Sequence, residues 1–175
     1  MIYRIYNTNM PYFIEFIDVY KSFDERTILD GVSFGVKQGE TFAILGPSGA
    51  GKTVTLTLAV GLLKPDRGQI IVDGEDITQM SERQLAHVRR KVQLVFQSGA
   101  LFDSLTVWEN VGFPLSDTGR TDEEIENKVA EYLRLVEIED LADLMSSELS
   151  TGMKRAVAIA RALAAQPKAI LYDEP

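Results

Sequence analysis

Short runs of apolar and β-branched residues, separated by turn residues, occupy much of the first hundred positions. The runs with the composition of buried strands span residues 13–19, 32–36, 41–45, 70–72 and 92–96. The dipeptide Asp73-Gly74, which follows the fourth run, favours a tight turn of the kind that joins two antiparallel strands. We therefore expect several short strands in this part of the chain.

Two further segments have helical periodicity. Residues 81–90 form one of them, with Ser81 as a candidate cap. The other begins at Thr121, where Glu124 stands three positions later and completes a capping box. Apolar residues then recur at helical spacing, at Ile125, Val129, Tyr132, Leu133 and Val136. The patterns predict strands mixed with helices up to residue 97 and a predominantly helical segment over residues 98–150.

The composition is that of an ordinary globular protein. The 175 residues are 45% hydrophobic and 25% charged, which suits one or at most two domains and excludes a disordered chain. Cysteine is absent, so a disulfide, a thiolate metal site and a cysteine nucleophile are excluded. The single histidine, His87, excludes a histidine-rich metal cluster, and we expect it to be a surface residue.

The net charge of −8 is concentrated in one segment. Residues 121–148 contain ten acidic residues and two basic ones, so this segment accounts for the whole net charge. A nucleic-acid partner requires a basic surface, so we expect none. The apolar runs are far shorter than a membrane span, which favours a cytoplasmic protein.

The strongest local signal is a glycine-rich run, here called the phosphate loop, directly after residues 41–45. The run is Gly46-Pro47-Ser48-Gly49-Ala50-Gly51-Lys52-Thr53. It matches the pattern G-x-x-x-x-G-K-[ST], in which backbone N–H groups cradle a phosphate at the amino end of a helix. In this pattern Lys52 reaches the outer phosphates and the Thr53 hydroxyl holds magnesium. The run predicts a site for a nucleoside triphosphate with Mg²⁺, and the alternative is a glycine turn with an exposed lysine.

The residues that follow the phosphate loop alternate between polar and apolar, which is a strand pattern. We nevertheless expect a helix over residues 52–63, because the phosphate loop requires a helix amino terminus there. Val54, Leu58 and Leu62 would form its buried face, and Lys64-Pro65 would end it.

The end of the sequence supplies two carboxylates. The apolar run 169–172 leads directly into Asp173 and Glu174. Beside a phosphate loop, a buried strand that ends in this pair places Asp173 near magnesium, and Glu174 can polarise the water that attacks the γ-phosphate. Alone, such a pair is as consistent with a surface turn, and the phosphate loop favours the functional interpretation.

Together these motifs resemble the nucleotide-binding subunits of ABC transporters, over about residues 13–175. Residues 149–153, Leu-Ser-Thr-Gly-Met, are similar to the LSGGQ signature of that family, and an alanine-rich helical segment follows them. Val95-Phe96-Gln97 resembles the Q-loop. Phe23 stands where the family keeps an aromatic residue that stacks on adenine.

The resemblance implies that the signature acts on a second subunit. Ser150 and Gly152 would bind the γ-phosphate of the ATP held by the opposite copy, so that two ATP molecules join two copies head to tail. The chain departs from LSGGQ at Thr151 and Met153. A β-branched residue resists a backbone with positive φ, so Thr151 leads us to expect a functional but weaker site.

The resemblance also assigns roles to the remaining motifs. Glu174 and Gln97 would be the catalytic residues. Thr53, Gln97 and Asp173 would hold Mg²⁺, while Phe23 and the phosphate loop would bind ATP. No role is implied for His87, which lies far upstream of the family's switch histidine.

The segment after Gln97 indicates a subtype. Residues 97–111 are similar to the ATPases of Mla/Mce-type systems, which move phospholipid or other lipid. A dense apolar cluster follows Gln97, formed by Leu101, Phe102, Leu105, Val107, Trp108 and Phe113. Its exposed part would make a groove for a helix of a membrane permease. The alternative is that these residues are only the core of the helical segment.

The fold class implied is α/β: a P-loop NTPase core with an N-terminal antiparallel β subdomain and an α-helical insert. We expect the core and β subdomain to comprise residues 13–97 and 150–175, the helical subdomain residues 98–149, and an N-terminal extension residues 1–12. The family's D-loop and switch histidine do not follow Pro175. We therefore expect a truncated subunit with little ATP turnover of its own.

The function implied is ATP binding and hydrolysis at a dimer interface, coupled to transport of lipid through permease subunits. The subunit would be cytoplasmic and peripheral on the inner (plasma) membrane through its permease. Two alternatives stay open. One is an importer ATPase for a small solute such as an amino acid, and the other is an ABC-type nucleotide-dependent module without a transport role.

Overall fold

The computed structural model describes residues 12–116 and 118–173. The chain separates into two compact units, the first ending at Arg89 and the second beginning at Arg90. The division into domains expected from the sequence is a different one, and it stays a prediction. Apart from Tyr12, the expected N-terminal extension lies outside the described residues.

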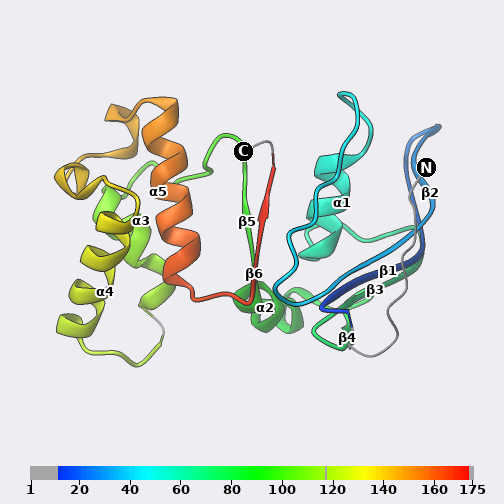
Figure 1. The fold of residues 1–175 in the computed structure, drawn as a ribbon, viewed down its shortest axis with the longest axis horizontal. Helices are drawn as coiled ribbons and strands as arrows, with labels where there is room; N and C mark the ends of the chain where they lie inside the picture. The colour runs from blue at the N-terminus through cyan, green and yellow to red at the C-terminus, as the bar shows by residue number, and fades with distance from the viewer. Residues whose placement is uncertain (1–11, 117, 174–175) are drawn as a thin grey trace. The chain divides into compact units, whose positions relative to one another are not determined.

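The first unit is built on an antiparallel sheet of four strands (Figure 1). These are β1 (Ile14–Phe23), β2 (Arg26–Val36), β3 (Arg67–Val72) and β4 (Glu75–Asp76), in the order β2-β1-β3-β4. Phe16 and Val19 of β1 and Ile70 and Val72 of β3 are almost fully buried. The strands expected near residues 13–19, 32–36 and 70–72 are confirmed, and so is an antiparallel β region.

The turn between β3 and β4 follows from two residues that tolerate a left-handed backbone. Asp73 has φ 51° and Gly74 has φ 79°, which is the combination that a type I′ turn requires. The turn brings Val72 opposite Glu75. The tight turn expected at Asp73-Gly74 is confirmed.

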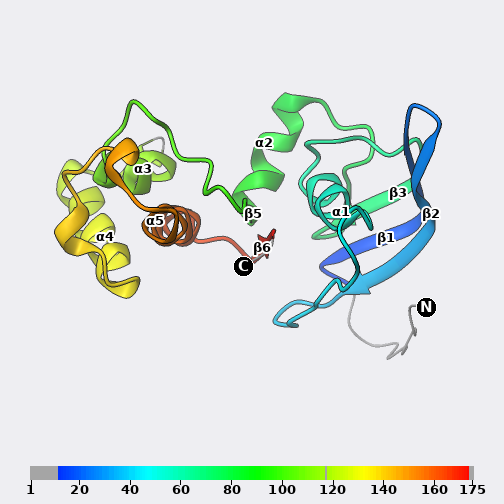
Figure 2. The ribbon, with the colours of Figure 1, turned by 90° about the horizontal axis from the view of Figure 1, so that it is seen from above.

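Helix α1 (Lys52–Ala59) packs beside β3 and begins directly after the phosphate loop (Figures 1 and 2). It is shorter than the helix expected over residues 52–63. Gly61, with φ 68°, ends it, and the Leu62 N–H donates back to the Thr57 carbonyl at 2.9 Å. This is a Schellman motif, so the helix ends before Lys64-Pro65 is reached.

The buried face of α1 also differs from the expected one. Thr55, Leu58 and Ala59 are buried, whereas Leu62 is 47% exposed. The Thr55 hydroxyl donates to the Gly51 carbonyl at 2.9 Å, so a polar side chain is accommodated against the sheet. The expectation of a helix here is confirmed despite the alternating pattern.

The strand expected over residues 41–45 is wrong. These residues belong to no strand, and neither described sheet includes them. Phe42 is 41% exposed and Leu45 is 91% exposed, although the Phe42 ring stacks on Phe34 with centroids 5.2 Å apart. An apolar run becomes a strand only where a neighbouring strand pairs with it, and sequence composition does not show the neighbour.

The second unit combines a parallel strand pair with a group of helices (Figure 2). Helix α2 (Glu82–Lys91), most of which belongs to the first unit, leads into β5 (Val92–Val95), which pairs in parallel with β6 (Ala169–Tyr172). The helices are α3 (Val107–Gly112), α4 (Asp122–Leu135) and α5 (Thr151–Ala164), with three short 3₁₀ segments at Phe113–Leu115, Glu139–Leu141 and Ser146–Glu148. The predominantly helical segment and the strand near residues 92–96 are confirmed.

Helix α5 packs against α3, α4 and β5. Its buried residues are mainly alanines, which allow neighbouring helices to approach closely. The core that it shares with them consists of aliphatic residues that are almost fully buried: Val107, Val111, Leu115, Val129, Leu133, Val157 and Ala160.

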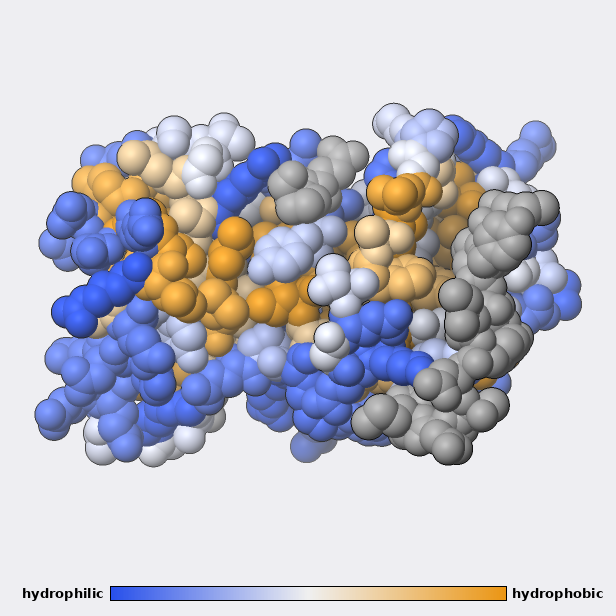
Figure 3. All heavy atoms as spheres, in the orientation of Figure 1, coloured by the Kyte–Doolittle hydropathy of each residue, from blue (hydrophilic) through white to orange (hydrophobic). Residues whose placement is uncertain are grey.

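Helix α4 carries five of the ten acidic residues of the segment 121–148. Its amino end has the expected capping box, in which the Thr121 hydroxyl accepts from the Glu124 N–H at 3.3 Å and the Glu124 carboxylate accepts from the Thr121 N–H at 2.8 Å. Val129, Tyr132 and Leu133 face the core, and hydrophilic side chains cover the surface over α4 (Figure 3). The acidic residues of α4 therefore form a solvated helical face. In the part of the chain that the structure describes, no helix has both the length and the apolar character to cross a membrane.

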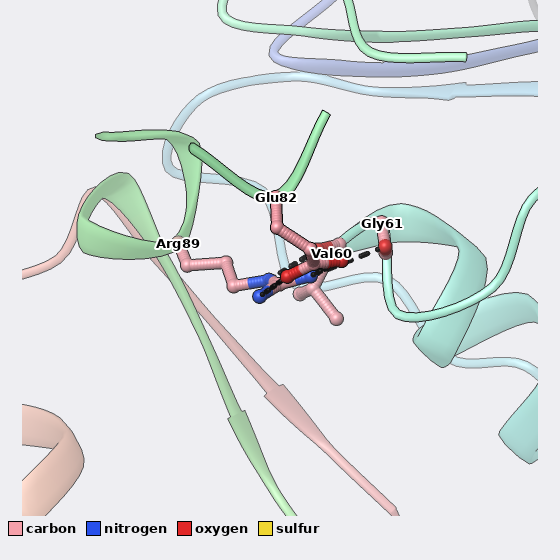
Figure 4. Close-up of polar contacts among 4 residues, drawn as sticks. All are labelled: Val60, Gly61, Glu82 and Arg89. Carbon is pink, nitrogen blue, oxygen red and sulfur yellow. Dashed lines mark hydrogen bonds and ion pairs between the residues drawn. The ribbon is translucent and has the colours of Figure 1, made fainter. Parts of the chain in front are cut away.

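The carboxyl end of α1 is held by an arginine of α2 (Figure 4). The Arg89 guanidinium donates to the Val60 carbonyl at 3.1 Å and the Gly61 carbonyl at 3.2 Å. It also donates to the Glu82 carboxylate at 2.8 Å, and this hydrogen bond holds the pKa of Glu82 below its usual range. A cation at this end of a helix also complements the helix dipole.

We expect Arg89→Met to lower the free energy of unfolding by about 1–3 kcal/mol, because two carbonyls at the end of α1 lose their donor. Urea unfolding measures this, with Arg83→Met, an exposed arginine of α2, as the control. The difference in unfolding free energy between wild type and Arg89→Met should shrink in acid. The stabilisation from the Arg89–Glu82 pair is fully present above the ordinary glutamate pKa, and it is lost as the pH falls through the lowered pKa of Glu82. Equal stability of the two variants at neutral pH would contradict the clamp.

Candidate functional site

The phosphate loop owes its shape to glycines with positive φ. Gly49 has φ 77° and Gly51 has φ 87°. Gly51 caps α1 in the left-handed conformation, and a Cβ there would come within 2.9 Å of Ile28 Cγ2. A side chain at Gly51 is therefore excluded both by the backbone and by the packing of β2. Residues 46–50 are exposed.

Lys52 spans the phosphate loop from the first position of α1. Its ammonium donates to the Gly46 and Pro47 carbonyls, each at 3.0 Å. The charge therefore lies against the concave backbone of the loop, at the amino end of a helix, where an anion is favoured. Phosphate oxygens can replace these carbonyls as acceptors without a change in the lysine's place.

Thr53, the second residue of α1, is exposed at the position where the pattern puts the magnesium hydroxyl. Among the described residues no group of three or more histidine or carboxylate side chains could hold a metal alone. A magnesium ion here would combine few protein oxygens with phosphate oxygens and water, as Mg²⁺ does in nucleotide sites. The residues present fit that arrangement.

The β1–β2 hairpin brings Phe23 to the same unit as the phosphate loop. Phe23 is 43% exposed at the end of β1, and the Lys21 ammonium lies 5.3 Å from its ring centroid. Lys21 also donates to Asp66 at 2.8 Å, and this hydrogen bond lowers the pKa of Asp66. The ring face that an adenine would need is therefore on a braced hairpin.

Arg26 is a neighbour of the phosphate loop that the sequence interpretation missed. It pairs with Phe23 across the hairpin, and its guanidinium lies 3.5 Å from the place of a Cβ on Gly49. Among the described residues the Arg26 guanidinium has no hydrogen-bond or ion-pair partner. The available signal was its spacing, three residues after Phe23, since a two-residue turn places both at the hairpin end.

Gln97 and Asp173 lie at one edge of the second unit. Val95 is opposite Tyr172 in the parallel pair, and the Asp173 N–H donates to the Val95 carbonyl at 3.0 Å. Parallel strands end at the same edge, so Asp173 and the exposed Gln97 follow neighbouring strand ends. This edge brings two of the three expected magnesium ligands together. Glu174 lies outside the described residues.

The signature forms the amino end of α5. The Ser150 hydroxyl caps the helix by accepting from the Met153 N–H at 3.3 Å. Gly152 is exposed, and a Cβ there would meet nothing within 4 Å. Thr151 begins the helix and is not among the described residues with positive φ. The positive φ that a β-branched residue would resist is therefore absent at Thr151, and the expected weaker site stays a prediction.

The apolar cluster after Gln97 divides between core and surface. Val107 is fully buried, and Leu101 and Trp108 pack on the helical core. Phe102 and Phe113 are 41% and 53% exposed, with ring centroids 4.5 Å apart. The interpretation as a helical core therefore accounts for the buried members of the cluster. The exposed aromatic pair leaves the contact with a permease a prediction.

Comparisons with known proteins agree on a family. A family model described as ABC transporter matches residues 29–175. The Fe(3+) ions import ATP-binding protein FbpC of Escherichia coli (strain K12) is 42% identical over 93% of this chain and 45% of its own length. The spermidine/putrescine import ATP-binding protein PotA of Trichormus variabilis is 43% identical over 96% of this chain and 43% of its own. The methionine import ATP-binding protein MetN of Carboxydothermus hydrogenoformans is 46% identical over 84% of this chain and 44% of its own.

Solved structures give the same result. A dimeric structure of MJ0796, a bacterial ABC transporter cassette, matches with a TM-score of 0.87 at 36% identity, over 93% of this chain and 74% of that one. The structure of cbiO1 from Clostridium perfringens, part of the ABC transporter complex cbiONQ, matches with a TM-score of 0.81 at 32% identity, over 94% of this chain and 66% of that one. The expected α/β fold of ABC ATPases is confirmed. The chain spans less than half the length of the curated relatives named above, and it belongs to the ABC transporter family as an ATP-binding domain.

Proposed function

We propose that this chain is the ATP-binding part of an ABC importer, which binds and hydrolyses MgATP between two copies and drives uptake of a small solute. The observation that carries the proposal is the geometry of Lys52. Its ammonium lies across a glycine loop at the amino end of α1, where loop N–H groups, helix dipole and positive charge all favour a triphosphate.

The residues of the first unit would bind the nucleotide. Phe23 offers a ring face for adenine, and the phosphate loop with Lys52 would hold the β- and γ-phosphates. Arg26 adds a guanidinium beside Gly49, where it can contribute a second positive charge. Thr53 would contribute its hydroxyl to magnesium, which neutralises charge that develops on the phosphates.

Residues of the second unit are proposed to have further roles. Gln97 and Asp173 are proposed as further oxygen ligands of magnesium, since both follow strand ends at one edge. Glu174 is proposed to orient and deprotonate the attacking water. The Ser150 hydroxyl and the open helix end at Gly152 are proposed to face the γ-phosphate bound by a second copy.

The substrate class is proposed from the relatives. FbpC, PotA and MetN are import proteins for Fe(3+) ions, spermidine/putrescine and methionine. These names support the small-solute importer, which the sequence offered as an alternative, over the lipid transport that it placed first. The solute itself would be bound by other subunits of such a system.

Two kinds of partner follow from the proposal. One is a second copy of this domain, supported by the dimeric MJ0796 cassette. The other is a membrane permease that contacts the exposed pair Phe102 and Phe113, through which the domain would be held at the cytoplasmic side of the inner membrane. Co-purification of the permease with the wild-type subunit but not with Phe113→Ser tests this contact.

The nucleotide site is tested with Lys52→Ala and Phe23→Ala. Lys52→Ala should abolish ATP binding or nearly so, because the triphosphate loses its main counter-charge. Phe23→Ala should weaken binding by about 1–3 kcal/mol, the scale of base–aromatic stacking. Isothermal titration with MgATP measures both. Lys64→Ala and Phe42→Ala, which remove an exposed lysine and an equally exposed ring of the same unit, are the matched controls.

Hydrolysis is tested with Glu174→Gln in the purified subunit. ATP binding should persist, and turnover should fall by roughly 10²–10⁴, the range typical of a lost general base. An ATP-bound dimer should accumulate, because the nucleotide that joins the copies is not cut. Phosphate release and gel filtration with ATP measure these effects, with Glu126→Gln on exposed α4 as the control. Near-normal turnover would show that another group activates the water.

A further inference from the structure

The loop that carries Gln97 lies directly on α5. The Gly99 N–H donates to the Phe96 carbonyl at 2.9 Å and closes a turn. Gly99 itself has φ 79°. A Cβ on Gly99 would come within 2.9 Å of the Lys154 carbonyl oxygen in the first turns of α5. Only glycine permits both this backbone conformation and this close approach. The loop and the helix are therefore in backbone contact.

Arg161 of α5 binds the same loop through its guanidinium. One nitrogen, Nη2, donates to the Gly99 carbonyl at 3.1 Å and to the Ala100 carbonyl at 2.9 Å. The guanidinium also lies 5.6 Å from the Phe102 ring centroid. Burial lowers the pKa of Arg161, but an arginine stays charged in proteins, so the carbonyls receive charge-assisted hydrogen bonds.

A second arginine of α5 reaches Gln97 itself. Arg155 Nε donates to the Gln97 carbonyl at 3.4 Å, a long hydrogen bond. Beyond Ala100 the loop is fixed by buried Asn110. The Asn110 side-chain oxygen accepts from the Phe102 N–H, and the Asn110 side-chain nitrogen donates to the Phe102 carbonyl. The backbone from Gln97 onward is thus held from inside the second unit.

We propose that Arg161, assisted by Arg155, is a positioning residue that fixes the Gln97 loop to the helix capped by Ser150. Gln97 would then respond to the subunit's own ATP and Ser150 to the ATP of the second copy as parts of one rigid piece. A change at either nucleotide is transmitted to the other through α5. This inference rests on the proposed function, because it assigns the motion of the proposed site to named side chains.

The geometry requires arginine at position 161. A planar guanidinium can bind two adjacent carbonyls and still lie beside the Phe102 ring, whereas a lysine ammonium is a point charge on a flexible stem. Arg161→Lys therefore keeps the charge and loses the alignment.

The test compares Arg161→Lys and Arg155→Gln with the wild-type subunit, using Arg134→Lys on the exposed end of α4 as the control. In both loop variants the turnover number should fall, by about tenfold to a hundredfold for Arg161→Lys, since small misplacement of a reacting group has costs of this size. The ATP dissociation constant should stay within about twofold of the wild-type value, because these residues are proposed to position Gln97 rather than to bind ATP. Hydrogen exchange should rise in the peptide 97–102 and stay unchanged in β6.

Two results would overturn the proposal. One is wild-type turnover and exchange in both loop variants. The other is a uniform rise in exchange across the second unit together with a lower melting temperature, which would show a purely structural role. A wild-type subunit that neither binds nor hydrolyses ATP would refute the proposed function instead, and the exchange result would still decide whether Arg161 holds the loop.

Discussion

Helix α1 is bounded at each end by a glycine in the left-handed conformation, and the placement of Lys52 and Thr53 depends on that pair. Gly51 directs the chain from the phosphate loop into the first residue of α1, and Gly61 reverses the direction of the chain after the last residue. At the first end the helix dipole favours an anion, while the second end has its carbonyls bound by Leu62 and Arg89. A helix of only eight residues is marginal alone, so its fixed ends and its packing on β3 are what keep its dipole aligned.

In the second unit, helix α5 holds proposed site residues in place. This helix carries Ser150 at its exposed amino end and contacts α3, α4 and β5 along its alanine-rich sides. Small side chains bring the neighbouring backbones close, so that the Gln97 loop can lie on the helix at Gly99. One element therefore supports two loops that the proposed chemistry needs.

The sequence predicted the parts of the fold that depend on local chemistry. The turn at Asp73-Gly74, the capping box at Thr121 and the helix after the phosphate loop all follow from backbone preferences within a few residues. The strand over residues 41–45 was wrong because a strand depends on a distant neighbour. The predicted end of α1 is too late in the chain, because Gly61 and not the proline at position 65 ends the helix.

The same distinction applies to the candidate site. The phosphate loop, Gln97, Asp173 and Ser150 could be found from motifs, because each motif is contiguous in the chain. Arg26 belongs to no contiguous motif: its spacing from Phe23 indicates only the hairpin end, and its nearness to Gly49, more than twenty residues later, arises from the folded chain. The subtype was set too narrowly by one apolar segment, since an exposed pair such as Phe102 and Phe113 indicates that something binds and not what is transported.

In each unit an arginine side chain donates hydrogen bonds to backbone carbonyls that would otherwise need a paired strand or a helix cap. Arg89 binds two successive carbonyls at the end of α1, and Arg161 binds two successive carbonyls of the Gln97 loop. In each case the carbonyls belong to residues outside a helix or strand, so no regular backbone hydrogen bond satisfies them. A guanidinium supplies several donors in a fixed plane and retains its charge when partly buried. Each arginine therefore ties a segment outside its own helix, the carboxyl end of α1 or the Gln97 loop, to the packing of the helix that carries it.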